Sequence, residues 1–185
     1  MTSPTSTPRT GNWIEFDERS NATDYLEMTA FFLENLPEAT KWKWVVISLH
    51  QALYAFLICA LRGGNWRSVL DKNDRLIGIW EALRRAKDQI YMTPVAGTPL
   101  VTTPDEDQAV QLLVSEFRNG FEHFIPVSWV IDARMVSGQI LGQVLRIVRF
   151  VALQSGPFVF ADDGEERRRV ENVLDRLDAL LAAIK

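Results

Sequence analysis

The chain has 185 residues, of which 47% are hydrophobic and 24% are charged, and its formal net charge is −4 at pH 7. This length and composition predict one globular domain with a large core. The acidic balance excludes a protein that binds nucleic acid over its whole surface, so any RNA contact is expected to be a local patch. The single cysteine, Cys59, excludes an internal disulfide and is typical of a reducing compartment.

The N-terminal end is rich in Thr, Ser and Pro, and residues 1–12 are predicted to be a disordered tail. Residues 13–185 are predicted to form a single helical domain, with Trp13, Ile14 and Phe16 holding its start. The tail has no apolar segment of the kind found in secretion signals. The most apolar stretch, residues 45–61, is short for a membrane span and ordinary for a buried helix. We therefore expect a cytoplasmic protein with no membrane partner.

Three helices are expected in the first half of the chain. The first begins near Asn21 or Thr23 and continues to about Leu36, and the second lies between Pro37 and the Gly63–Gly64 pair. Apolar residues lie almost all round the second helix, which places it at the centre of the bundle. The third is expected over residues 71–91, with four side chains directed inward: Leu76, Ile79, Trp80 and Leu83. Residues 92–103 form a long loop, and loops of this length are often functional or mobile.

The fourth helix has the clearest start, because Thr103 is a typical N-cap, Pro104 suits the first helical position and Glu106 completes a capping box. Its apolar stripe consists of Val110, Leu113, Val114, Phe117, Phe121 and Phe124, and Pro126 ends it. A fifth helix is expected from about Ser128 to Leu153, and a last one from Asp162 or Asp163 almost to the C-terminus. Long helices with short connections and no strand predict an all-α fold, an up-and-down antiparallel bundle of about five or six helices.

Several kinds of chemistry have no motif in this sequence. It lacks a Gly-rich phosphate loop, a Cys/His cluster with zinc spacing, a Glu-x-x-His pair and a Gly-x-Ser-x-Gly turn. We therefore expect no metal and no cofactor. The arginines at 167–169 and at 84–85 are interpreted as solvated helix faces paired with neighbouring carboxylates. His50 is interpreted as a hydrogen-bonded core residue. Lys41 and Lys43 alternate with Trp42 and Trp44, but on a helix these tryptophans point in different directions, which favours packing over a nucleic-acid site.

The candidate site is the segment from Arg118 to His123 at the end of the fourth helix. Arginine binds two phosphate oxygens at once, and histidine transfers protons near neutral pH. RNA supplies its own nucleophile, the 2′-hydroxyl, so an arginine and a histidine that converge on a phosphodiester suffice for cleavage without a metal.

The spacing of the two residues raises a geometric difficulty. Five residues of a straight helix turn through about 500°, so the side chains of Arg118 and His123 diverge by about 140°. Two arrangements would bring them together. Gly120 and Pro126 loosen the last turn, or two copies of the helix meet across a dimer axis and form a composite cleft.

Arg118 and Asn119 followed by His123 resemble the Arg-x(4–6)-His motif of HEPN-domain proteins, in which a polar residue commonly follows the arginine. The helix order over much of residues 20–155 is also similar to that family. The resemblance implies an HEPN-like bundle and a homodimer that cuts RNA without metal, in a toxin, phage-defence or stress role. Arg118 would stabilise the phosphate, His123 would be the acid and base, and Asn119 would orient the histidine or contact RNA. An antitoxin protein would be a further partner, although Ile125 stands where HEPN toxins often have a tyrosine.

Two other interpretations remain open. Arg118 and Glu122 are four residues apart and suit a simple surface ion pair, while His123 suits the C-terminus of a helix. The chain would then be a non-catalytic HEPN-like module that binds RNA or a nucleotide, or a helical protein-interaction domain. The second of these is indicated by six tryptophans, because exposed aromatic residues favour partner surfaces.

Overall fold

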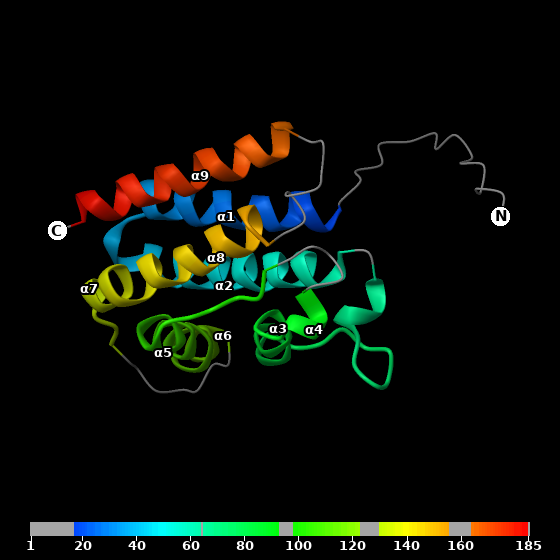
Figure 1. Ribbon diagram of the computed structural model, residues 1–185. Coiled ribbons are helices and arrows are strands. Elements are labelled where there is room, and N and C mark those ends of the chain that lie inside the picture. Colours follow the sequence, from blue (N-terminus) through cyan, green and yellow to red (C-terminus); the bar gives the residue numbers. More distant parts are fainter. Residues whose placement is uncertain (1–16, 64, 93–97, 123–129, 156–163, 185) are drawn as a thin grey trace, which may run out of the picture.

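A computed structural model describes residues 17–63, 65–92, 98–122, 130–155 and 164–184. All regular elements in these ranges are helices (Figure 1), and one isolated β-bridge joins Leu70 to Leu76. The predicted all-α class is confirmed. Counted as continuous runs, the described residues form seven helices rather than five or six. The tail and its anchors Trp13, Ile14 and Phe16 lie outside the described residues.

The described elements, in chain order, are α1 (Glu18–Asn35), α2 (Glu38–Arg62), the 3-10 turn η1 (Trp66–Val69), α3 (Ile79–Ala86), α4 (Gln89–Met92), α5 (Pro104–Gln111), η3 (Leu112–Arg118), α6 (Asn119–Glu122), α7 (Ala133–Met135), η4 (Val136–Leu141), α8 (Gly142–Leu153) and α9 (Gly164–Ala183). Two of the runs are composite: α5, η3 and α6 follow one another without a break, and so do α7, η4 and α8.

The first two helices form an antiparallel hairpin. α1 begins earlier than predicted, because the carboxylate of Asp17 accepts hydrogen bonds from the backbone N–H groups of Arg19 and Ser20 and caps the helix there. α2 begins after Pro37 and ends at Gly63, as predicted, and Gly63 has a positive φ of 33° that favours glycine. α2 packs against α1, α3, α8 and η3, which confirms its place at the centre of the bundle.

The third predicted helix was wrong over its first half. The carboxylate of Asp71 accepts hydrogen bonds from the backbone N–H groups of Asn73 and Arg75, and Asp74 has a left-handed φ of 55°, so this segment forms a turn. The helix starts only at Ile79. Of the side chains predicted to point inward, Leu83 is buried, whereas Leu76 and Trp80 are exposed.

The start of α5 agrees with the sequence in detail. The backbone N–H of Glu106 donates to the hydroxyl of Thr103 at 3.2 Å, and the N–H of Thr103 donates to the Glu106 carboxylate at 2.8 Å. What the sequence did not indicate is that η3 and η4 are π-helical. In the next composite helix, Asp132 caps the start, so the described part begins at Ala133 rather than near Ser128.

The core lies between the α1–α2 hairpin, α8 and α9, with η3 closing one side of α2. Its largest fully buried side chains include Phe56, Leu49 and Leu53 of α2 and Leu145 of α8. By length and composition, the helices Glu38–Arg62 and Ala133–Leu153 would both be able to cross a membrane, but 72% of the most apolar window of the first is buried inside the bundle. The core helix of a water-soluble bundle has the same properties, so the expectation of a cytoplasmic protein stays a prediction.

Candidate functional site

The composite helix that carries Arg118 is anchored at its start and along η3. The capping box fixes its first turn, and Leu113, Val114 and Phe117 of η3 are buried against the core. η3 and the centre of α2 are packed together. Arg118 is the last residue of the π-helical segment, so its position depends on this packing.

The guanidinium of Arg118 is held by two residues of the next turn. Its Nη2 lies 2.5 Å from a carboxylate oxygen of Glu122, and its Nη1 donates to the side-chain oxygen of Asn119 at 2.9 Å. Arg118 and Glu122 are 26% and 29% exposed, so solvent reaches the pair. The third nitrogen, Nε, is buried and has no hydrogen-bond partner among the described residues. One interpretation of the sequence predicted an ion pair between Arg118 and Glu122, and this ion pair forms. It leaves Nε of the guanidinium without a hydrogen bond among the described residues.

η3, which ends at Arg118, packs against α2, and there the charge of Arg118 acts on His50, which the sequence did not indicate. The side chain of His50 is buried, with 5% exposure, as predicted. The expected hydrogen bond is missing at its Nδ1, which has no partner in the part of the chain that the structure describes. Burial and, second, the positive charge of Arg118 lower the pKa of His50 from 6.5 to about 4. At neutral pH His50 is therefore an uncharged imidazole within electrostatic reach of the Arg118 guanidinium.

His123, the other half of the predicted motif, lies outside the described residues, as do Ile125 and Pro126. The structure thus places Arg118 and Asn119 together and leaves their relation to His123 a prediction. The described part of the last turn keeps ordinary α-helical spacing, because Arg118 and Glu122, four residues apart, form an ion pair. The proposed loosening at Gly120 is not seen up to Glu122.

The helical distortion lies on both sides of this segment instead. Within the described ranges, the only π-helical segments are η3, which ends at Arg118, and η4, which begins at Val136. In sequence they flank His123. Short π-helical turns are rare and are frequent at functional sites, because the wider turn redirects side chains at a cost in hydrogen bonding.

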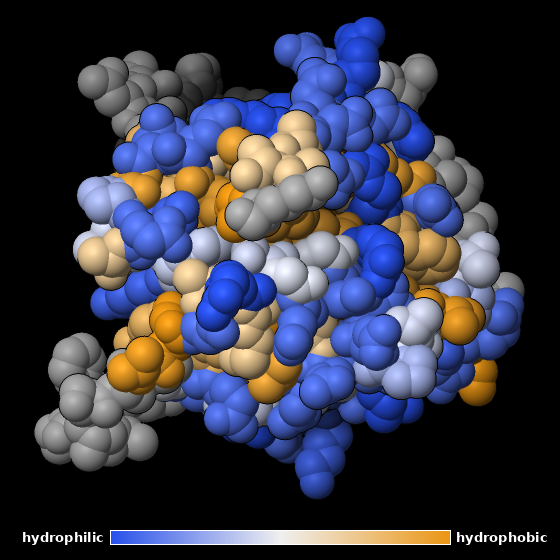
Figure 2. Space-filling model, turned by 90° about the vertical axis from the view of Figure 1, so that its left-hand side faces the viewer, coloured by the Kyte–Doolittle hydropathy of each residue, from blue (hydrophilic) through white to orange (hydrophobic). Residues whose placement is uncertain are grey.

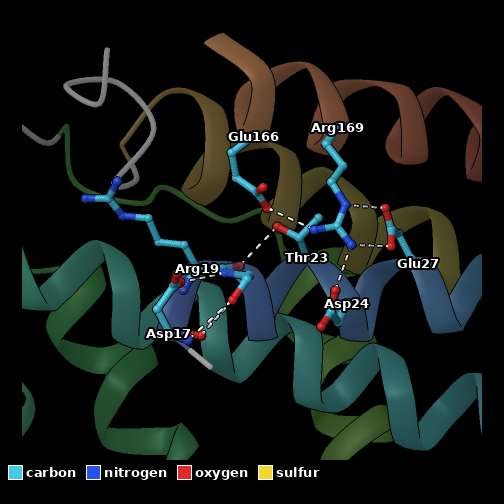
Figure 3. A network of polar contacts seen from close by, with 8 residues as sticks. Asp17, Arg19, Thr23, Asp24, Glu27, Glu166 and Arg169 are labelled. Carbon is cyan, nitrogen blue, oxygen red and sulfur yellow. Dashed lines mark hydrogen bonds and ion pairs between the residues drawn. The ribbon is translucent and has the colours of Figure 1, made fainter. Parts of the chain in front are cut away.

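Of the other charged candidates, four arginines have carboxylate partners as predicted, but those of Arg169 lie mainly on α1 and not on its own helix. Arg169 of α9 donates to Glu27 and Asp24 of α1, as Figure 3 shows, and Arg167 pairs with Glu171. In the same way, Arg84 and Arg85 both bind Glu81, and these two partners lower the pKa of its carboxyl to about 2. These clusters stabilise the fold and have no unsatisfied guanidinium of the Arg118 kind.

The tryptophans differ in their exposure. Trp42 is buried, whereas Trp44 is exposed and has the ammonium of Lys43 over its ring, so the two rings diverge as predicted. Trp66 and Trp80 are also exposed, while Trp13 and Trp129 lie outside the described residues. The interaction-domain interpretation therefore keeps its support.

Within the described ranges no group of three or more His, Cys, Asp or Glu side chains is placed to hold a metal ion. Burial raises the pKa of the Cys59 thiol to about 12, so the thiolate that reacts or binds metals is not formed at neutral pH. In the comparisons with known proteins, no family model, curated protein or solved structure matches the chain.

Proposed function

We propose that this chain is a metal-independent endoribonuclease of the HEPN type, with Arg118 and His123 as its catalytic residues. The observation that supports it best is the state of Arg118. Neighbouring side chains hold its guanidinium at the surface, at the end of a π-helical segment and five residues before His123.

The chemistry uses only the RNA and these two side chains. The 2′-oxygen of a ribose attacks the adjacent phosphorus, and the bond from phosphorus to the 5′-oxygen of the next nucleotide breaks. His123 accepts the proton of the 2′-hydroxyl and then passes it to the leaving 5′-oxygen, so it acts as base and then as acid. Arg118 binds the non-bridging oxygens and stabilises the charge that develops on them. The products are a 2′,3′-cyclic phosphate and a free 5′-hydroxyl.

Glu122 has a defined part in this proposal. Its carboxylate forms an ion pair with the terminal nitrogen of Arg118 that a phosphate oxygen would bind. Binding of RNA therefore requires the phosphate to replace Glu122, and Asn119 keeps the guanidinium oriented while that happens. The helical spacing calls for a second copy, whose His123 meets Arg118 of the first across a dimer axis.

The test is cleavage of a mixed-sequence RNA in EDTA by the wild type, Arg118→Ala and His123→Ala. Arg84→Ala is the matched control, since Arg84 is also a surface arginine in a local ion pair. We expect the first two substitutions to reduce the rate at least a hundredfold and the control to leave it unchanged. The proposal fails if the wild type, shown to be folded by circular dichroism, does not cut RNA, or if cleavage survives both substitutions.

A non-catalytic interaction domain is the second candidate, and the exposed Trp44, Trp66 and Trp80 favour it. It predicts that a folded wild type lacks nuclease activity and that substitutions of these tryptophans, rather than of Arg118, abolish its binding to a partner.

A further inference from the structure

Hydrophilic residues cover much of the end of the bundle where α1 turns into α2 (Figure 2), and few polar residues lie inside the fold. In the described ranges five polar residues are buried, and one of them is His50, whose Nδ1 has no hydrogen-bond partner there. A buried polar atom without a hydrogen bond is costly, so the unpaired Nδ1 calls for an explanation. The other four residues carry hydroxyls that donate to backbone carbonyls: Thr23, Thr29, Ser48 and Ser155.

Arg118 has a second unpaired atom on the helix that faces His50. Two nitrogens of its guanidinium are held from the next turn, because Nη2 pairs with Glu122 and Nη1 donates to Asn119. The third nitrogen, Nε, is buried and lacks a partner among the described residues. η3, which ends at Arg118, packs against α2, and the charge of Arg118 acts on the imidazole of His50. The two unpaired atoms therefore belong to two helices that pack on each other.

The two atoms are complementary in their chemistry. The Nε of an arginine keeps its hydrogen in folded proteins and can only donate. A neutral imidazole has one nitrogen that donates and one that accepts, and a nearby cation favours the form that directs the acceptor toward it. Burial and, second, the charge of Arg118 lower the pKa of His50 to about 4, so its imidazole is neutral near pH 7. Nδ1 of His50 is thus suited to accept the hydrogen bond that Nε of Arg118 can donate.

We propose that His50 is a positioning residue for Arg118: when an RNA phosphate replaces Glu122, Nε of Arg118 donates a hydrogen bond to Nδ1 of His50. All three nitrogens of the guanidinium then have partners, namely the phosphate, Asn119 and His50. This inference rests on the proposed function, because it takes Arg118 as the residue that binds the phosphate. It extends the site to α2, a helix that does not belong to the Arg118–His123 segment.

The contacts of the free chain explain why the exchange at Glu122 matters. Glu122 and Asn119 both belong to α6, so in the free chain both hold the guanidinium along its own helix. A phosphate that arrives from solvent and replaces Glu122 removes one of these contacts, and the side chain can then turn toward α2. A guanidinium fixed at Nε presents its terminal nitrogens in one direction, as binding of two phosphate oxygens requires. His50 is only 5% exposed, so it acts through Arg118 and does not contact RNA itself.

The experiment measures binding of a 2′-O-methyl RNA, which is not cleaved because its 2′-oxygen is blocked. Fluorescence anisotropy in EDTA compares the full chain of the wild type with His50→Phe, His50→Asn and Gln143→Leu. Phenylalanine fills the space of the imidazole without an acceptor, whereas asparagine keeps an acceptor oxygen near the place of Nδ1. Gln143 is the matched control, because its Oε1 is also buried without a partner in the described part of the chain but belongs to α8.

We expect His50→Phe to weaken RNA binding about tenfold, as is usual for the loss of a hydrogen bond to a charged group. His50→Asn should stay within about twofold of the wild type, because it keeps the acceptor, and Gln143→Leu should bind as the wild type does. In an Arg118→Ala background, His50→Phe should cause no further loss, since His50 acts only through Arg118.

A second measurement needs no variant of His50 and so does not depend on whether such a variant folds. Nitrogen NMR of the imidazoles, with the His50 signals identified in His123→Ala, follows Nδ1 while the 2′-O-methyl RNA is added. We expect the Nδ1 signal of the wild type to move toward the range of a hydrogen-bonded acceptor. The same signal should stay unchanged in Arg118→Ala, which lacks the donor.

Three results would overturn the proposal: an Nδ1 signal that RNA leaves unchanged in the wild type, equal losses of binding in His50→Phe and Gln143→Leu, or a loss in His50→Phe that persists without Arg118. A folded wild type that does not bind the RNA would do so too. Failure of the proposed function is recognised separately. A wild type that shows the expected binding pattern but does not cut unmodified RNA keeps the role of His50 and removes the nuclease. Equal rates of cleavage by the wild type and His50→Phe would do the reverse.

Discussion

Two contacts between helices of this bundle differ in how completely the guanidinium of their arginine is hydrogen-bonded. Where α9 packs on α1, two nitrogens of the Arg169 guanidinium donate hydrogen bonds to the Glu27 carboxylate. One of them also donates to Asp24, and all three donor–acceptor distances are within 2.7 Å. Where η3 lies on α2, Arg118 has one carboxylate at its tip, and both its Nε and the Nδ1 of His50 are buried without a partner among the described residues. A buried polar atom without a hydrogen bond costs about 1–3 kcal/mol. The first contact satisfies its arginine fully, whereas the second leaves two buried polar atoms without a partner in the described part of the chain.

The largest expected effect is on the α2–η3 contact and depends on pH. The pKa of His50 is lowered to about 4 in the folded chain, whereas in the unfolded chain it lies near 6.5. Above pH 6.5 both states are neutral and His50 adds no pH dependence. As the pH falls from 6.5 to 4, the unfolded state takes up the proton first, so the free energy of unfolding decreases by up to about 3 kcal/mol.

Urea denaturation at pH 7, 5.5 and 4.5 measures this decrease. His50→Leu should remove most of it, while His123→Ala, the control for the second histidine of the chain, should keep it. An equal decrease in the wild type and in His50→Leu would show that other groups cause it.

The opposite contact should respond strongly to loss of its arginine. Arg169→Ala leaves Asp24 and Glu27 beside each other without their cation, and we expect a loss of about 1–3 kcal/mol in the free energy of unfolding. The control is Arg168→Ala, an exposed neighbour on the same helix. If both variants lose the same small amount in urea denaturation, the α1–α9 ion pairs do not stabilise the fold.

The smallest expected effect concerns Glu122. In Glu122→Gln, Arg118 loses its anionic partner, so a phosphate no longer competes with a carboxylate for the guanidinium. We expect RNA to bind a few-fold more tightly, by under about 1 kcal/mol, as is usual for a partly exposed ion pair. Fluorescence anisotropy of a labelled RNA measures this, with Glu81→Gln beside Arg84 as the control. Weaker binding by Glu122→Gln would mean that Glu122 orients Arg118 for RNA instead of competing with it.

Local chemistry decided which parts of the fold the sequence could predict. The start of α5 was predicted down to its hydrogen bonds, because Thr103 and Glu106 are three residues apart and cap only each other. The third helix was predicted too early, because the turn made by the Asp71 carboxylate competes with a helical apolar pattern. The resulting exposure of Trp80 follows from that turn and not from the spacing of the residues.

Only the contacts within one helix could be predicted for the candidate site. The closeness of Arg118, Asn119 and Glu122 follows from helical spacing. The approach of His50 does not, because it depends on how η3 packs across α2, two helices that the sequence separates widely. The π-helical turns were also beyond prediction, since the choice between two backbone acceptors is made by tertiary packing.

The proposed site is composite and metal-free, made from Arg118 and His123 of two copies. It is tested most directly by mixing the inactive variants Arg118→Ala and His123→Ala, letting their subunits exchange, and measuring RNA cleavage in EDTA. A mixed dimer keeps one arginine and one histidine for the shared cleft, so the mixture should regain cleavage that neither variant shows alone. A mixture that stays inactive while the wild type cuts would contradict a site shared between two copies.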